Sequence, residues 1–428
     1  MQRDPQRLFA LDVLRGFAIA LVLFRHVPIA PDSSEPVLRF LFGIGWAGVD
    51  LFFVLSGFLI SGLLYREVDA SGTINFRRFW LRRGMKIWPS YFAVYGGFTL
   101  LLIAAAWFRG DASPVDNVWP NLVFIQNYFP YEIRWPHSWS LAIEEHFYIF
   151  LPVLMIALTA RGRAGLGWLP WIGAAVCVLT LAGRWFAAAA PGAAWNDFYY
   201  PTHFRADSLL FGVILGFLAH YHRETFEKIA SAWPALVLAV VPVLTLAYLL
   251  PLDDPGTTFA YTLGFTLLYL GFGALVVIAG AYPSAGERNL AARAMAWMGV
   301  YSYTIYLTHS VIFRLPGAGW LPAFVRQQVF DSPWVDRVLF WVLSIATGYL
   351  VSRLIERPFL ELRKRWLPSA RPHPLTPAQP HPIPPSPLPF PPPSYGEGTG
   401  VRQTKETDQG VWVPTMKDRR RVSRAGTH

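Results

Sequence analysis

Two ionisable residues in the first apolar run of the chain, Arg15 and His26, are candidates for chemistry inside an apolar helix. Charged side chains are rare and costly there, so each one suggests a function. The two residues are eleven positions apart, which places them about 20° apart around a helix and about 16 Å apart along it. They share one helix face, where His26 is suited to proton transfer near neutral pH. The alternatives are an arginine that snorkels to the interface and a histidine that caps the helix.

Two carboxylates at the starts of other apolar runs could complete an acid–base site with His26. Asp50 begins the second run, and Glu144 lies at the start of the fourth, beside Glu145. A carboxylate beside an imidazole holds its tautomer and stabilises its protonated form. The alternative for both acids is a helix N-terminus, where they cap the backbone or favour the helix dipole. Adjacent residues point to different sides of a helix, so we expect only one glutamate to face the interior.

Basic residues follow the second apolar run. Arg82 and Lys86 share a helix face at i, i+4 spacing, with Arg83 next to them. Several cations together suit a phosphate-rich ligand such as coenzyme A. The alternative is a topology signal or a contact with anionic lipids.

Later apolar runs contain three further ionisable candidates. Arg205 and Asp207 open the sixth run, either as a buried ion pair that holds the site or as an interfacial pair. His309 lies in the outer half of the ninth run, where the alternative is a hydrogen-bonded packing residue. The predicted catalytic residues are His26, Asp50 and Glu144, and the predicted substrate-binding residues are Arg15, Arg82, Arg83, Lys86, Arg205, Asp207 and His309. We expect no metal site, because the H-x-H pair at 220–222 has no third ligand nearby.

The composition indicates which elements must position these residues. Of the 428 residues, 54% are hydrophobic and 15% charged, against roughly 25% charged in an average soluble domain. Repeated apolar runs of membrane-spanning length account for the difference. They predict an all-α polytopic integral membrane protein of about ten helices, with spans at residues 8–28, 46–65, 88–108, 139–159, 168–188, 204–220, 234–251, 259–281, 297–314 and 337–356.

Lysine and arginine are concentrated on alternate loops between these spans. This distribution explains the net charge of +10 as a topology signal, so we expect no nucleic acid partner. It predicts a multi-pass protein of the inner (plasma) membrane with both termini in the cytoplasm. The first run is interrupted by Asp12 and Arg15, which indicates a retained helix instead of a cleavable signal peptide.

The C-terminal part of the chain has a different character. Thirteen prolines lie between Pro368 and Pro393, and the remainder is polar and basic. Such a segment cannot bury enough apolar surface to fold. We therefore expect a transmembrane domain over residues 1–366 and a disordered cytoplasmic tail over residues 367–428, first proline-rich and then basic.

Taken in order, these motifs resemble those of the membrane acyltransferase-3 family over residues 8 to about 366. Arg15 and His26 match its Arg-x10-His motif, and Asp50 lies in a match to its Gly-Val-Asp-Leu-Phe-Phe-Val-Leu-Ser-Gly-Phe block. A segment containing Arg82, Arg83 and Lys86 matches the family's Arg-Arg-x-x-Arg-Ile-x-Pro block. A segment containing Glu144 matches its Trp-Ser-Leu-x-x-Glu-x-x-Phe-Tyr block. Lys86 replaces the third arginine, which keeps the charge but loses the planar fork.

The resemblance implies an acyltransferase that moves an acyl group from cytoplasmic acyl-CoA to a hydroxyl of an extracytoplasmic glycan or related envelope acceptor. We expect the acyl group to be acetyl. Acyl-CoA would be the donor substrate, and we expect no permanently bound cofactor. His26 would be the general base or a transient acyl carrier. The alternative is a proton-coupled transporter in the lipid bilayer, with the intramembrane ionisable residues as its relay. No internal repeat of the transporter kind is visible, which favours the acyltransferase.

Overall fold

The protein is described by a computed structural model that covers residues 8–27, 35–110, 118–129, 135–234, 237–238, 240, 258–314 and 333–368. Within these ranges the regular structure is entirely helical. In the described part of the chain, six helical segments are long and apolar enough to cross a membrane, and the shorter helix Ala206–Tyr221 is apolar as well. The predicted all-α, multi-pass membrane fold is therefore confirmed.

Most of the predicted spans coincide with observed helices. The matching helices are α1 (Phe9–His26), α3 (Gly48–Ser71), α4 (Phe76–Arg109), α6 (Trp139–Thr159), α7 (Leu169–Ala188), α9 (Ala206–Tyr221), α12 (Phe265–Ala281), α13 (Leu290–Arg314) and α15 (Pro333–Val351). The predicted span 234–251 lies mostly outside the described residues, and so does almost all of the predicted tail. The boundary predicted at residue 366 remains a prediction.

Shorter helices flank and connect these spans. They are α2 (Pro36–Ile44), α5 (Trp119–Leu122), α8 (Trp195–Tyr199), α10 (Arg223–Ser231) and α16 (Arg357–Trp366). The 3-10 turns are Gly45–Ala47, Gln126–Tyr128, Pro136–Ser138, Arg163–Trp168 and Thr202–Phe204, and the π-helical turns are Ala260–Gly264 and Ser352–Glu356. The second π-helical turn joins α15 to α16, so the last helical segment continues well beyond the predicted end of its span.

The basic segment after the second span is helical over its length. It forms the first turns of α4 (Phe76–Arg109), a helix of 34 residues. The Asn75 side chain accepts a hydrogen bond from the backbone N–H of Arg78 and so caps this helix. Phe79 and Ile87 are buried, because the apolar positions of this basic stretch fall on the face that packs against the bundle.

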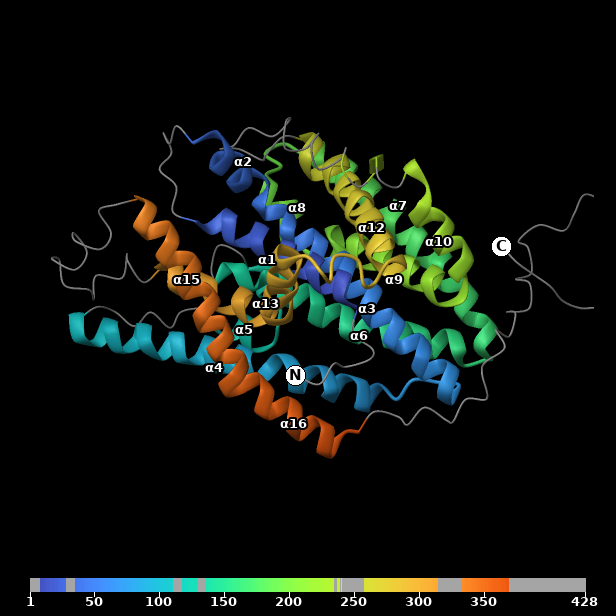
Figure 1. Ribbon diagram of the computed structural model, residues 1–428, viewed down its shortest axis with the longest axis horizontal. Coiled ribbons are helices and arrows are strands. Elements are labelled where there is room, and N and C mark those ends of the chain that lie inside the picture. Colours follow the sequence, from blue (N-terminus) through green and yellow to red (C-terminus); the bar gives the residue numbers. More distant parts are fainter. Residues whose placement is uncertain are drawn as a thin grey trace, which may run out of the picture. The chain divides into compact units, whose positions relative to one another are not determined.

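The helices of the transmembrane part pack around a centre formed by α1, α3 and α13 (Figure 1). The most extensive contact joins α1 and α13, which also packs against α15. On the other side, α3 packs against α9, and α9 packs against α7 and α12. Helix α4 crosses α16 (Figure 1). Arg15 and His26 on α1 therefore lie at the centre of the bundle.

Two glycines let the backbones of α1 and α13 touch. A Cβ atom on Gly16 would overlap the carbonyl oxygen of Met295, and one on Gly299 would overlap that of Asp12. Small residues at a helix crossing allow this close approach in membrane proteins. The crossing holds Arg15, which is adjacent to Gly16, in a fixed position against α13.

We expect Gly299→Ala to destabilise the protein by about 1–3 kcal/mol, because the added methyl group meets backbone that cannot rotate away. Thermal unfolding in detergent measures this loss. The matched control is Gly97→Ala on α4, where an added Cβ meets nothing within 4 Å. Equal melting temperatures for the two variants would show that the α1–α13 crossing is looser than described.

The ends of four helices meet at one end of the bundle. The Asp69 carboxylate lies 2.6 Å from Nε2 of His220, and the Asp69 carbonyl accepts a hydrogen bond from Arg163. Arg223 donates to the carbonyl of Gly280. The chain segments after α3, α6, α9 and α12 are thus neighbours, which is the arrangement that the alternation of basic loops predicts.

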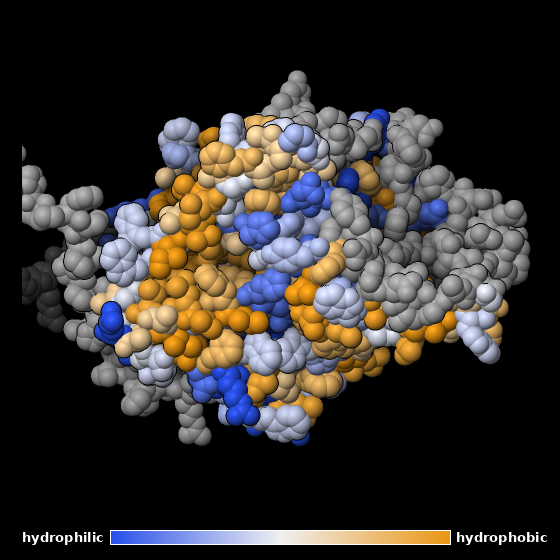
Figure 2. Space-filling view, turned by 180° about the vertical axis from the view of Figure 1, so that it is seen from behind, coloured by the Kyte–Doolittle hydropathy of each residue, from blue (hydrophilic) through white to orange (hydrophobic). Residues whose placement is uncertain are grey.

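Large apolar side chains remain exposed on the surface of the bundle. They include Trp107, Phe108, Leu179, Phe186 and Leu354, each more than two-thirds exposed. Figure 2 shows broad hydrophobic areas on the face seen from behind, with hydrophilic residues gathered in separate patches. A soluble monomer rarely exposes so much apolar surface, whereas a lipid bilayer would cover it.

Candidate functional site

A cavity of about 300 Å³ lies between α1, α3, α4, α6 and α13; we call it the central cavity. Its charged residues are Arg15, Arg66, Arg83, Lys86 and Glu144. Its hydroxyl groups come from Ser56, Ser140, Tyr148, Ser302, Tyr303 and Tyr306, and the rest of its wall is apolar, contributed mainly by α3. Four cations against one carboxylate make the central cavity attractive to a ligand that is anionic at one end and apolar at the other.

Glu144 is held in place within this cavity by two hydroxyl donors. Ser56 Oγ donates to one carboxylate oxygen over 2.9 Å, and Tyr148 Oη donates to the other over 2.8 Å. Hydroxyl groups can fix the direction of a carboxylate without neutralising it. The carboxylate therefore remains available to a group bound in the central cavity.

Both adjacent glutamates of α6 face the protein interior, which corrects the prediction that only one would. Glu145 is 5% exposed, and the indole Nε1 of Trp88 lies 3.4 Å from its carboxylate. The two acids differ in their surroundings, since only Glu144 lines the central cavity. The pattern on α6 failed here because α4 covers the second face of the helix.

Tyr306 connects the central cavity to a group of histidines. Its hydroxyl lies 2.6 Å from Ser140 Oγ and donates to the carbonyl of His137. Because the Tyr306 hydroxyl donates its one proton to that carbonyl, Ser140 is the donor in the contact between the two hydroxyls. The Tyr306 ring also lies 5.5 Å from the ring of His309.

His26 and His309 are neighbours across the α1–α13 crossing. Their ring centroids are 4.7 Å apart, in an edge-to-face arrangement. The Nδ1 atom of His26 is 2.9 Å from the carbonyl oxygen of Val22, one turn earlier on α1. A carbonyl can only accept, so Nδ1 has the proton and Nε2 is left with a free electron pair. In that tautomer Nε2 is the nitrogen that can act as a general base.

Asp50 has a different partner from the one predicted. Its carboxylate lies 2.6 Å from Arg205, and both side chains are fully buried. The Arg205 guanidinium also lies over the ring of Phe265, 3.8 Å from its centroid. A parallel pair joins Asp207 to Arg184 over 2.7 Å, again with both side chains fully buried. We call these the buried ion pairs.

The predicted catalytic trio therefore divides among three sets of contacts. His26 belongs with His309, Asp50 with Arg205, and Glu144 with the cations of the central cavity. The idea that Asp50 orients the His26 imidazole does not fit these contacts. Asp50 and Arg205 instead fix α3 against the start of α9.

The predicted substrate-binding residues also divide. Arg15, Arg83 and Lys86 line the central cavity. Arg82 instead contacts α16, where it donates to the carbonyl of Leu367, while Arg363 donates to the Arg82 carbonyl. The i, i+4 spacing of Arg82 and Lys86 did place them near one face, but α16 covers the side on which Arg82 lies.

Arg184, Arg66 and Ser56 are not among the site residues predicted from the sequence. Arg184 could have been selected from the sequence. It is an arginine at the predicted outer end of the span 168–188, where the alternation of basic loops does not favour an arginine. Arg66 lies just after the predicted span 46–65, and Ser56 lies within that span. Nothing in the local pattern shows that these two side chains reach a shared cavity.

We expect Asp50→Ala to lower the stability by about 3–5 kcal/mol, because it leaves the buried Arg205 charge without its carboxylate. Thermal unfolding in detergent measures the effect, and the double variant Asp50→Ala/Arg205→Met should recover part of it. The control is Glu227→Ala, which breaks the half-exposed Arg223–Glu227 pair and should cost about 0.5 kcal/mol or less. An Asp50→Ala protein as stable as the control would contradict the pairing.

Comparison with known proteins gives a match along nearly the whole described chain. The sequence model of an acyltransferase domain, Acyl_transf_3, matches residues 8–367. A Staphylococcus aureus (strain COL) protein named "Putative O-acetyltransferase" is 30% identical over 372 residues, which cover 82% of this chain and 56% of that protein. The peptidoglycan O-acetyltransferase OatA of Listeria monocytogenes is 26% identical over 334 residues, which cover 72% of this chain and 49% of the relative. The chain thus spans about half the length of these curated relatives, and no solved structure matches it.

Proposed function

The chain belongs to the acyltransferase-3 family, and from this premise we propose that it transfers an acyl group from acyl-CoA to a hydroxyl of an envelope carbohydrate. The observation that carries the proposal is the central cavity, in which four cations and Glu144 lie at the centre of a membrane-spanning bundle. We take acetyl as the acyl group, because the relatives are named O-acetyltransferases.

The cations of the central cavity fit the donor. Coenzyme A has several phosphate groups, and arginine and lysine are the side chains best suited to bind them. Arg66, Arg83 and Lys86 would bind phosphate, while the apolar wall from α3 would receive the less polar arm and the acyl group. Since Tyr306 and Ser140 line this cavity and lead to the histidines, the thioester would lie toward them.

The acceptor would meet His26 at the other end of α1. Nε2 of His26 would take the proton of the attacking hydroxyl, as a general base. Of the relatives, OatA is named as acting on peptidoglycan. A glycan hydroxyl of the envelope is accordingly the acceptor class that we propose for this chain.

The basic loops support an orientation in the inner (plasma) membrane with both termini in the cytoplasm. The bundle end around Asp69 would then be cytoplasmic, and His26 would lie toward the outside. The donor would enter from the cytoplasmic side, where acyl-CoA is made.

We expect single cysteines to report this orientation, after Cys177→Ala removes the one native cysteine. Ala190→Cys lies at the exposed end of α7, on the predicted outer side, and Thr73→Cys follows α3, on the predicted cytoplasmic side. A membrane-impermeant thiol reagent added to intact spheroplasts should label position 190 and spare position 73. The reverse labelling pattern would invert the proposed orientation.

An assay of the purified protein tests the proposed acyl transfer. Release of the free thiol from acetyl-CoA should be slow alone and should increase when soluble peptidoglycan glycan strands are added, with ester-linked acetyl on the glycan. Thiol release that does not depend on any carbohydrate would count against a glycan acceptor. The absence of both thiol release and donor binding would remove the acyltransferase function.

A further inference from the structure

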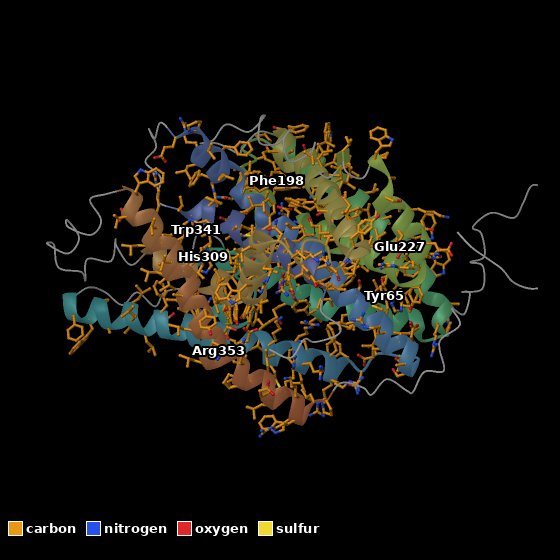
Figure 3. The ribbon with its side chains drawn as sticks, in the orientation of Figure 1. Tyr65, Phe198, Glu227, His309, Trp341 and Arg353 are labelled. Atoms are coloured by element: carbon orange, nitrogen blue, oxygen red, sulfur yellow. The ribbon has the colours of Figure 1, made fainter. Side chains whose placement is uncertain are left out.

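His309 is the most deeply buried histidine near the central cavity. It lies on α13 inside the bundle (Figure 3) and is 0% exposed. The ring of His26 lies 4.7 Å from it and the ring of Tyr306 lies 5.5 Å from it. Because Tyr306 lines the central cavity, His309 contacts both His26 and a residue of the cavity wall.

The hydrogen bonds of His309 fix its tautomer. Nδ1 is 2.5 Å from the carbonyl oxygen of Tyr306, and a carbonyl can only accept, so the proton is on Nδ1. Nε2 is buried, retains its electron pair, and has no hydrogen-bond partner among the residues that the structure describes. Most buried polar atoms are partnered, so an unpartnered basic nitrogen requires an explanation. His26 has the same tautomer, so two basic imidazoles lie next to each other.

We propose, on the basis of the acyl transfer proposed above, that His309 carries the acceptor's proton from His26 to the departing thiolate of the donor. The acceptor O–H bond breaks as its oxygen attacks the thioester carbonyl, and the proton goes to Nε2 of His26. It then passes to Nε2 of His309. When the C–S bond breaks, sulfur takes the electron pair and then this proton. The products are an ester and a free thiol, and both imidazoles are neutral again.

The third histidine of the group does not fit this role. Trp135 Nε1 donates to Ser310 Oγ over 2.9 Å, and the same oxygen lies 2.8 Å from Nδ1 of the His137 ring. The His137 carbonyl accepts from Tyr306. These contacts make His137 part of the packing around the site. His137 is thus a matched control, with a ring only 5.3 Å from that of His309.

The choice of leaving group tests the relay. The purified full-length protein is given either acetyl-CoA or S-phenyl thioacetate, with soluble peptidoglycan glycan strands as acceptor. Thiophenolate is a much more stable anion than an alkyl thiolate and leaves without a proton. His309→Asn should therefore lose about 10²-fold in rate with acetyl-CoA, as expected for loss of a positioned acid, and less than tenfold with S-phenyl thioacetate.

The controls separate this role from a structural one. His26→Asn removes the base, so its rate of acyl transfer should fall by the same factor with both donors. His137→Asn should change the rate only slightly, and by the same factor with both donors. If His309→Asn lowers the rate by the same factor with the two donors, the relay is overturned. His309→Gln repeats the test if the asparagine variant does not fold. Wild-type protein that transfers from neither donor would overturn the proposed function itself, and the relay with it.

Discussion

Replacing His26 by alanine is expected to lower the rate of acyl transfer by about 10²- to 10⁴-fold, the usual effect of losing a general base. Donor affinity should stay within about twofold of the wild type, because His26 does not line the central cavity. The single-turnover rate gives the first quantity, and calorimetric titration of acetyl-CoA in detergent gives the second.

The control for the His26 variant is a histidine at the same end of the bundle. His146 is half-buried, and its Nδ1 lies 2.8 Å from Thr202 Oγ1, outside the group formed by His26 and His309. His146→Ala should keep the wild-type rate. A His26→Ala protein that transfers normally, or that loses donor affinity instead of rate, would remove His26 from the role of base.

Replacing Lys86 or Arg83 by alanine is expected to weaken acetyl-CoA binding about 10- to 100-fold. Each would lose a charge-assisted contact to phosphate, worth about 1.5–3 kcal/mol. The single-turnover rate at saturating donor should change much less, because the lost contact is made in the ground state as well. Calorimetry and rates at several donor concentrations separate the two effects.

The neighbouring residue on α4 supplies the comparison. Arg82 was predicted from the sequence to bind the donor, but it contacts α16 outside the central cavity. Arg82→Ala should therefore raise the dissociation constant far less than Arg83→Ala. If the two variants weaken binding equally, the donor extends beyond the central cavity toward α16.

The sequence predicted the helical spans well, because apolar runs of membrane length have few other solutions. The span 139–159, for example, has the same limits as α6. The basic stretch at the start of α4 lay outside the predicted spans because of its charge, although Phe79 and Ile87 form a buried face there. Span position follows from composition, whereas the ends of a helix depend on what packs against them.

The partners of the ionisable residues could not be predicted from the sequence. Asp50 and Arg205 are 155 positions apart, and no local pattern connects them. The shared face of Arg15 and His26 followed from helix geometry, but which residues meet that face depends on the crossing of α1 with α13. Periodicity gives the direction of a side chain, whereas its partner is set by tertiary packing.

Transfer across a sealed membrane tests the central claim most directly. Proteoliposomes are loaded with acetyl-CoA labelled in the acetyl group, and soluble peptidoglycan glycan strands are added outside only. We expect labelled acetyl to appear on the external glycan, at a rate that Lys86→Ala lowers at limiting donor and His26→Ala abolishes. Label that reaches the glycan only when donor and glycan are on the same side would contradict transfer through the bundle. If unreacted labelled acetyl-CoA is exported from the vesicles and no ester is formed, the protein is instead a transporter.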